Sequence, residues 1–377
     1  MQDRFRRNKM KKLKLLPLMV MMLSLMVPYK LIASTHDDDN PNTFKYERCM
    51  YNTASEIVAE AIPNVVYIFM ERGPEVTFDD EFGGLMPSIP RPTSGIGTGF
   101  FINDEGYIVT NAHVVKGATT LKIFYWDSPL EYGDAEIVGI DEIADIAVVK
   151  INPEGPTKFV EWGDSDKLEM GSDVIAIGHG LSMPWAVTKG IISYVDRSPD
   201  KSKPMITYNQ SDTVINQGNS GGPLFDMCGK VVGVNTLLFS RTGSFSGVGF
   251  SIPSNLAKRS VDQIIEKGYT TYPAIGIQMK VVSTLEERKH LLSIGIESVV
   301  KVDKPSEGGA AELAGLKSGD ILVEVGGHEI VGSLDIIKQL WYNEIGDILK
   351  VKVYRDGEFM TFDVKLQPFI FQNLEGK

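Results

Sequence analysis

The chain has few cysteines and few histidines for its length. Its 377 residues include only two cysteines, Cys49 and Cys228. This number excludes a disulfide-rich scaffold and a cysteine-based metal cluster. A single bridge between the two remains open, although thiols so far apart in sequence are more often small buried side chains. The five histidines, which limit the choice of a general base, are His36, His113, His179, His290 and His328.

Positive charge is scarce outside the first residues. The formal net charge is −11, although residues 1–34 carry eight basic side chains and one acid. The remainder is therefore strongly acidic, which argues against nucleic acid and anionic membrane as partners. The length is too great for one ordinary core, so two domains and a tail are expected.

The sequence also lacks an apolar run long enough to span a bilayer with ease. The longest, 15–29, is interrupted by Pro17 and Pro28, whereas a spanning helix needs about 20 apolar residues. A basic start followed by a short apolar run predicts a signal peptide over 1–34 and export to the periplasm or another secretory space. The alternative is an uncleaved anchor facing the periplasm, and only then would the membrane be a partner. Residues 35–53 form a polar N-terminal arm.

A glycine-rich turn around Ser220 carries the first sign of chemistry. Three glycines flank the serine in Gly218-Asn219-Ser220-Gly221-Gly222-Pro223. Glycine loses the most backbone freedom on folding, so such a run needs a geometric reason. A turn of this kind can expose the Ser220 hydroxyl and direct neighbouring N–H groups at one point, where an oxyanion would form. The alternative is an ordinary hairpin turn with a solvated serine.

The positions of the histidines distinguish two serine-hydrolase architectures. In an α/β-hydrolase the serine comes first, whereas in the chymotrypsin arrangement the order is histidine, aspartate, serine. Only His290 and His328 follow Ser220, and they lie in a charged run and at a hairpin tip. Upstream, His113 follows an apolar strand and Asp145 opens another. The order is therefore that of chymotrypsin, and an esterase of the α/β-hydrolase class is disfavoured.

Three segments resemble the catalytic blocks of the HtrA (Deg) serine proteases. They are Thr110-Asn-Ala-His-Val-Val115, Asp145-Ile-Ala-Val-Val-Lys150 and Ile215-Asn-Gln-Gly-Asn-Ser-Gly-Gly-Pro223, and the flanks Gly95-Ile-Gly-Thr-Gly-Phe-Phe and Gly249-Phe-Ser-Ile-Pro-Ser-Asn255 agree. The resemblance extends from about residue 54 to about residue 366. It implies Ser220 as nucleophile, His113 as base and Asp145, rather than the nearby Asp141, as its partner. It also implies an oxyanion hole at Gly218, Asn219 and Ser220, and it requires no metal and no cofactor.

The expected fold is mostly β. Many short strands separated by turns indicate a sandwich or barrels, and a helix is expected up to Gly268, with Ser254 and Asn255 as its cap. The resemblance implies a chymotrypsin-like protease domain of two six-stranded barrels over 54–268. Residues 71–94 would form its surface loop. Aromatic residues of the arm hold a trimer together in HtrA-like proteases; alternatively Phe44, Tyr46 and Tyr51 pack on their own domain.

The S1 pocket should be apolar. Val214 and Ile215 stand where a trypsin-like pocket would need an acid, and Leu237 and Leu238 lie on the opposing wall. We therefore expect a small or medium aliphatic P1 residue.

One segment departs from the family pattern. Gly178-His179-Gly180 stands where the family usually shows Gly-Asn/Tyr-Pro. We interpret His179 as a loop residue and not as a second catalytic base.

The composition changes after Gly268. Residues 269–370 resemble one PDZ domain of the HtrA kind, an α+β fold, followed by a tail over 371–377. Such domains add a peptide to a sheet edge and bind its terminal carboxylate through backbone N–H groups. The carboxylate loop would be Ala274, Ile275, Gly276 and Ile277.

The sequence as a whole predicts a serine endopeptidase of protein quality control. Its partners would be unfolded proteins and C-terminal peptides, and it would form a homotrimer or a multiple of trimers. The alternative is a catalytically idle relative that acts as a chaperone or peptide-binding protein.

Overall fold

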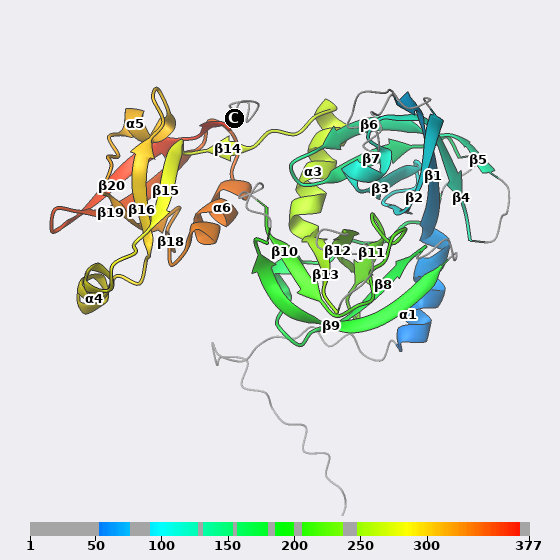
Figure 1. Cartoon of the computed structure of the whole chain (residues 1–377), viewed down its shortest axis with the longest axis horizontal. Coiled ribbons are helices and arrows are strands. Elements are labelled where there is room, and N and C mark those ends of the chain that lie inside the picture. Colours follow the sequence, from blue (N-terminus) through cyan, green and yellow to red (C-terminus); the bar gives the residue numbers. More distant parts are fainter. Residues whose placement is uncertain are drawn as a thin grey trace, which may run out of the picture. The chain divides into compact units, whose positions relative to one another are not determined.

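The computed structural model describes residues 53–75, 91–126, 131–153, 157–179, 185–199, 206–236 and 247–369. The predicted leader, the arm up to residue 52 and the tail lie outside this range, as do Leu237 and Leu238. The strands fall into three sheets of five or more strands, with one short two-stranded pair besides (Figure 1).

The first seven strands form one antiparallel sheet in the order β5-β4-β1-β2-β3-β7-β6. They are β1 (Val65–Glu75), β2 (Arg91–Phe101), β3 (Tyr107–Thr110), β4 (Ala118–Phe124), β5 (Glu131–Asp134), β6 (Glu136–Asp141) and β7 (Ile146–Lys150). β-Branched side chains such as Ile68, Ile108 and Ile123 fill its buried face. The prediction of six strands here was wrong by one, because β5 adds a strand at the free edge of β4.

The next six strands close into a barrel in the order β10-β13-β12-β11-β8-β9 (Figure 1). They are β8 (Asp173–Gly178), β9 (Ala186–Arg197), β10 (Tyr208–Ser211), β11 (Pro223–Phe225), β12 (Val231–Thr236) and β13 (Gly249–Pro253), and the 3₁₀ turn η3 (Ser165–Lys167) precedes them. Most of the residues in β8, β11, β12 and β13 are buried on both faces. The second barrel therefore has the predicted six strands.

Helices lie at the beginning and at the end of this region of the chain. The first, α1 (Ala54–Ala61), begins with a reciprocal capping box between Thr53 and Glu56 and continues as η1 (Ile62–Asn64) into β1. The last, α3 (Ser254–Lys267), ends at Gly268, whose φ of 81° provides the left-handed cap. Its cap differs from the prediction, because the helix begins at Ser254 itself and Pro253 occupies the N-cap position.

The predicted surface loop is shorter than expected. Residues 71–75 and 91–94 continue the ladder between β1 and β2, with Glu71 opposite Ser94 and Glu75 opposite Arg91. Residues 76–90, which include three of the five acids and two of the four prolines of the loop, lie outside the described residues.

The C-terminal region has its own sheet and core. Strands β15 (Ile277–Val281), β16 (Val300–Pro305), β17 (Ile321–Val325), β19 (Ile348–Arg355) and β20 (Glu358–Lys365) follow this order across the sheet, β18 (His328–Glu329) pairs with β17, and β14 (Pro273–Ala274) pairs with β21 (Gln367–Pro368). The helices are α4 (Leu285–Ser293), α5 (Ala310–Ala314) and α6 (Ser333–Trp341). Ile336 and Leu340 of α6 pack with Val351 in the core.

Cys228 is part of a disulfide. The sequence contains only one other cysteine, Cys49, which lies outside the described residues. The expectation of two separate buried thiols is therefore wrong for Cys228. None of the helices in the described part of the chain is long and apolar enough to cross a membrane.

Candidate active site

The three predicted catalytic residues lie at the ends of strands. His113 is in the short helix α2 (Ala112–Val115), which follows β3 directly. Asp145 is in the turn between β6 and β7, and Ser220 is in the turn before β11. The first two residues therefore come from the seven-stranded sheet and the third comes from the closed barrel.

The Asp145 carboxylate holds the His113 ring and its backbone together. The ring Nδ1 donates to Oδ2 at 2.8 Å and lies 3.1 Å from Oδ1, while the His113 N–H donates to Oδ1 at 3.0 Å. Because a carboxylate accepts and cannot donate when ionised, Nδ1 carries the proton and Nε2 is left as an acceptor. His113 is thus in the tautomer that a general base requires, with about half of its side chain exposed.

The backbone of Asp145 is held in an uncommon conformation. Its φ is 58°, in the left-handed region that aspartate tolerates better than most residues. Its carbonyl accepts the N–H of Ala112 at 3.1 Å and the side-chain amide of Asn111 at 2.9 Å. These bonds fix the turn, so that the carboxylate is aimed at His113 at a strain of about 1 kcal/mol or more.

Two further residues support this pair, and neither was singled out from the sequence. Thr236 at the end of β12 donates its hydroxyl to Asp145 Oδ2 at 3.1 Å. Arg72 of β1 donates to the carbonyls of His113 and Lys116, which lie at the end of α2. Both contacts join residues more than 40 positions apart, so no local pattern could have indicated them.

The glycines of the Ser220 turn are required by close approach of other backbone. A Cβ on Gly218 would lie 2.1 Å from the carbonyl oxygen of His179. A Cβ on Gly221 would lie 2.2 Å from both Thr98 O and Thr110 Oγ1. Both glycines also have positive φ, 102° and 84°. Gly221 therefore allows close packing of this turn against β2 and β3 of the seven-stranded sheet, and Gly218 allows close packing against the end of β8.

Two N–H groups in this turn have no acceptor among the described residues, and these are the N–H groups of Gly218 and Ser220. The intervening N–H of Asn219 donates to Asn216 O at 3.0 Å, and its side-chain amide donates to Val214 O at 3.3 Å. An oxyanion would need two unoccupied donors close together. The arrangement therefore offers Gly218 and Ser220 as the donors and assigns Asn219 a structural part in the turn.

The Ser220 hydroxyl makes no hydrogen bond to His113 among the contacts of the described residues, and Ser220 is only 5% exposed. Such contacts are often long in enzymes without substrate and shorten when substrate binds. The structure therefore places the Ser220 turn and the His113–Asp145 pair at facing strand ends. The hydrogen bond between these two described residues, from the Ser220 hydroxyl to His113, is not formed.

Asp141, the competing acid, has a different environment. Its Oδ2 accepts the hydroxyls of Ser260 at 2.7 Å and Tyr272 at 2.6 Å, and its Oδ1 accepts the N–H groups of Ile143 and Ala144. Burial and the neighbouring Asp141 raise the pKa of Tyr272 well above its ordinary value. All of the bonds of Asp141 thus serve the packing of α3 and the β6–β7 turn, and none reaches His113.

The predicted S1 residues are described only in part. Ile215 is buried, and its Cδ1 would lie 3.1 Å from a Cβ on Gly249 of β13. Val214 is 38% exposed. Ile215 therefore packs directly against Gly249, where a side chain would crowd it.

The predicted carboxylate loop of the C-terminal region precedes an edge strand. β15 pairs only with β16, so its other edge is free within the described residues. Ile275 is buried and its carbonyl accepts Ala311 N–H at 2.7 Å, while Gly276 has a φ of 73° and accepts Ser306 N–H at 2.9 Å. A fixed loop beside a free strand edge is the geometry that strand addition requires.

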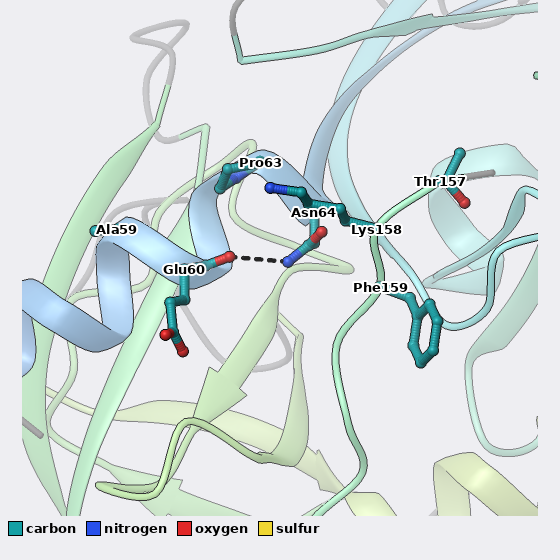
Figure 2. A pocket seen from close by; sticks show the side chains of 7 residues that line it. All are labelled: Ala59, Glu60, Pro63, Asn64, Thr157, Lys158 and Phe159. Carbon is teal, nitrogen blue, oxygen red and sulfur yellow. Dashed lines mark hydrogen bonds between the residues drawn. The ribbon is translucent and has the colours of Figure 1, made fainter. Parts of the chain in front are cut away.

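An open hollow of about 560 Å³ lies away from these residues. It is lined by Ala59, Glu60, Pro63, Asn64, Thr157, Lys158 and Phe159 (Figure 2). Inside it the Asn64 side-chain amide donates to Glu60 O at 2.9 Å. None of the predicted site residues lines this hollow.

Comparison with family models matches two regions of the chain. Residues 97–234 match a trypsin-like peptidase domain and residues 273–366 match a PDZ domain. The first match contains His113, Asp145 and Ser220, and the second contains the predicted carboxylate loop.

Several curated proteins are similar over most of the chain. "Putative serine protease HhoB" of Synechocystis sp. is 36% identical in an alignment of 341 positions that covers 84% of this chain and 80% of that protein. "Serine protease Do-like HtrA" of Bacillus subtilis is 36% identical over 72% of this chain and 64% of its own length. "Probable periplasmic serine endoprotease DegP-like" of Marinomonas sp. is 36% identical over 76% of this chain and 60% of its own length. The chain thus spans less than two thirds of the last two.

Two similar solved structures are also proteases. The HtrA-type protease AlgW with tripeptide has a TM-score of 0.69 and 27% identity, over 85% of this chain and 98% of that one. The serine endoprotease from Yersinia pestis has a TM-score of 0.57 and 26% identity, over 85% of this chain and 100% of that one.

Proposed function

The chain belongs to the HtrA/Deg family of trypsin-like serine proteases, and we propose that it is an endopeptidase with Ser220 as its nucleophile. The observation that carries this proposal is the His113–Asp145 pair in the correct tautomer, opposite a turn with two unoccupied N–H donors. A structural role for the turn alone would not require both arrangements.

In the first step His113 Nε2 accepts the Ser220 proton while Ser220 Oγ bonds to the carbonyl carbon of the peptide. The carbonyl π bond breaks and leaves a negative oxygen, which the N–H groups of Gly218 and Ser220 stabilise. One such donor is worth about 3 kcal/mol in the transition state. Asp145 stabilises the imidazolium and keeps the ring in place.

The imidazolium then gives its proton to the departing amine, the C–N bond breaks, and an acyl-enzyme on Ser220 remains. Water then attacks the acyl carbon while His113 accepts a proton from it. His113 returns this proton to Ser220 Oγ as the ester bond breaks. His113 is therefore neutral in the acyl-enzyme, because the Ser220 proton has left with the amine, and it is neutral again after it returns the water proton to Ser220 Oγ.

The substrate is protein or peptide, and we propose an aliphatic P1 residue. The apolar residues Val214 and Ile215, where a charged pocket would need an acid, support a pocket without charge. We assign Leu237 and Leu238 to the same pocket from the sequence. A cationic P1 side chain would lose its hydration there without gaining a partner.

Unfolded proteins are the proposed natural substrates, in a periplasmic or equivalent exported location. The names of the DegP-like relatives support this compartment. The Cys228 disulfide supports it as well, because disulfides persist in oxidising compartments. The proposed assembly is a homotrimer or a multiple of it, with the PDZ domain binding C-terminal peptides at Ala274–Ile277.

Cleavage of unfolded β-casein with mass-spectrometric mapping of the cut sites tests the activity and the pocket together. We expect cuts after valine, alanine, isoleucine or leucine. Protection of β-casein from aggregation without any cutting would instead support the idle chaperone, and cuts after lysine or arginine would contradict the pocket assignment.

A further inference from the structure

We propose that His179 is a positioning residue of the oxyanion hole, which it orders through the hydroxyl of Thr98. This inference rests on the proposed function, because it concerns the two N–H donors assigned to Gly218 and Ser220. It gives a role to the one segment that departs from the family pattern.

Thr98 of β2 binds the Ser220 turn at two carbonyl groups. Its hydroxyl donates to Gly218 O at 2.6 Å, and its N–H donates to Ser220 O at 2.9 Å. The peptide unit between Gly218 and Asn219 is also held at its N–H, by Asn216 O. Both ends of this unit are therefore fixed, and the rotations that would turn the two donors away from an oxyanion are restricted.

Counting the protons around the Thr98 hydroxyl assigns the direction of each bond. A hydroxyl has one proton and two acceptor lone pairs. Gly218 O cannot donate, so the 2.6 Å contact takes the Thr98 proton. The two remaining contacts, from the His179 N–H and ring Nδ1 at 3.1 Å each, must then be donated by His179. His179 thus occupies both acceptor lone pairs of the Thr98 hydroxyl oxygen. The hydroxyl proton can then point only at Gly218 O.

The His179 ring suits this task because it is neutral and immobile. It is fully buried, and burial lowers the pKa of His179 to about 3. Its ring lies edge to face against Tyr67 and Trp185, with centroids 5.1 and 4.8 Å away. Nε2 is buried and has no partner among the described residues, so placing the single ring proton on Nδ1 avoids burying an unpaired donor.

The test compares two pairs of variants. Thr98→Val removes the hydroxyl at nearly constant shape, and Thr98→Ser keeps it. His179→Phe keeps an aromatic ring between Tyr67 and Trp185 but removes the donor, and His179→Asn keeps an amide N–H close to the position of Nδ1. For each, kcat and KM are measured on a short chromogenic peptide, together with the unfolding temperature and the activity of Ser220→Ala.

Thr98→Val and His179→Phe should lower kcat by about 10- to 100-fold with little change in KM, since losing a whole oxyanion donor costs about 10²–10³-fold and here the donors remain but lose their orientation. Thr98→Ser and His179→Asn should recover most of kcat. A purely structural role would lower the unfolding temperature of all four variants without this split.

The proposal is overturned if Thr98→Val and His179→Phe keep the wild-type kcat, or if His179→Asn falls as far as His179→Phe. Either result with an inactive Ser220→Ala leaves the proposed function intact. An active Ser220→Ala would instead reject the proposed function itself.

Discussion

The hydroxyl of Thr236 donates to Asp145 Oδ2 at 3.1 Å. Thr236 is the last residue of β12 in the closed barrel, whereas Asp145 lies between β6 and β7 of the seven-stranded sheet. This contact completes the partners of Oδ2, whose other donor is the His113 ring. The proposed base is therefore oriented by residues of both the seven-stranded sheet and the closed barrel.

Thr236→Val should lower kcat by roughly tenfold and leave KM nearly unchanged, because a hydrogen bond to a charged group contributes about 1.5 kcal/mol. Steady-state kinetics on a short peptide measures this. Thr236→Ser retains the hydroxyl and is the matched control. Equal losses in both variants would mean that packing of the methyl group, and not the hydrogen bond, matters.

Asp145→Asn should lower kcat by about 10⁴-fold, because an amide N–H facing Nδ1 favours the wrong tautomer of His113. Asparagine tolerates the positive φ of this position, so the fold should survive. Circular dichroism and single-turnover kinetics check both points.

Asp141→Asn is the control for that variant. Asp141 accepts from Ser260 and Tyr272 and does not contact His113. The Asp141→Asn variant should therefore be less stable, but the molecules that remain folded should keep most of the wild-type kcat. The reverse pattern, with Asp141→Asn inactive and Asp145→Asn active, would exchange the two assignments.

Acid should destabilise the fold through His179. The pKa of His179 is about 3 in the folded state and about 6.5 in an unfolded chain. The folded state thus favours the neutral ring. Its contribution to the free energy of unfolding is complete above pH 6.5 and is lost as the pH falls toward 3. At about 1.4 kcal/mol per pH unit, roughly 2 kcal/mol should disappear between pH 7.5 and pH 5.

Urea unfolding at pH 7.5 and at pH 5 measures this loss of unfolding free energy. His179→Asn has no proton to gain, so its loss of stability over the same interval should be smaller by about 2 kcal/mol. An identical loss in both proteins would show that other groups account for the acid sensitivity.

Gly276→Ala should weaken binding of a peptide with a free apolar C-terminus by about tenfold, roughly 1.4 kcal/mol. The added methyl would lie 3.3 Å from Gly309 Cα, next to the proposed carboxylate loop. Gly295→Ala is the matched control, since its φ of 80° is equally unfavourable but its Cβ would meet open space.

Calorimetric titration of both variants, with an amidated peptide as a second control, measures the effect. We also propose that peptide binding activates the protease, so that the cleavage rate of the wild type should rise about 5- to 150-fold with peptide. Equal affinities of Gly276→Ala and Gly295→Ala would move the carboxylate site elsewhere.

Local patterns were sufficient for the parts of the fold that depend on neighbouring residues. The strand that ends before His113, the strand that begins after Asp145 and the helix end at Gly268 were predicted from such patterns. The dipeptide Asp356-Gly357 is likewise the usual signal of a hairpin turn. In that hairpin both residues have positive φ, as a primed turn requires, and Arg355 pairs with Glu358.

Contacts between distant segments could not be predicted in this way. The Thr98–His179 bond joins residues 81 positions apart, and the Thr98–Gly218 bond spans 120. Nothing near His179 in the sequence distinguishes a positioning residue from a simple loop residue. The additional strand β5 was missed for the same reason, because its existence depends on the free edge of β4.

The most direct test of the central claim is the activity of Ser220→Ala on unfolded β-casein, together with fluorophosphonate labelling of the wild type. We expect one label, on Ser220. The Ser220→Ala variant should neither react nor cut, yet it should unfold at the same temperature and bind the C-terminal peptide equally well. Cleavage by Ser220→Ala at a rate comparable to wild type, or a label on another residue, would contradict the central claim.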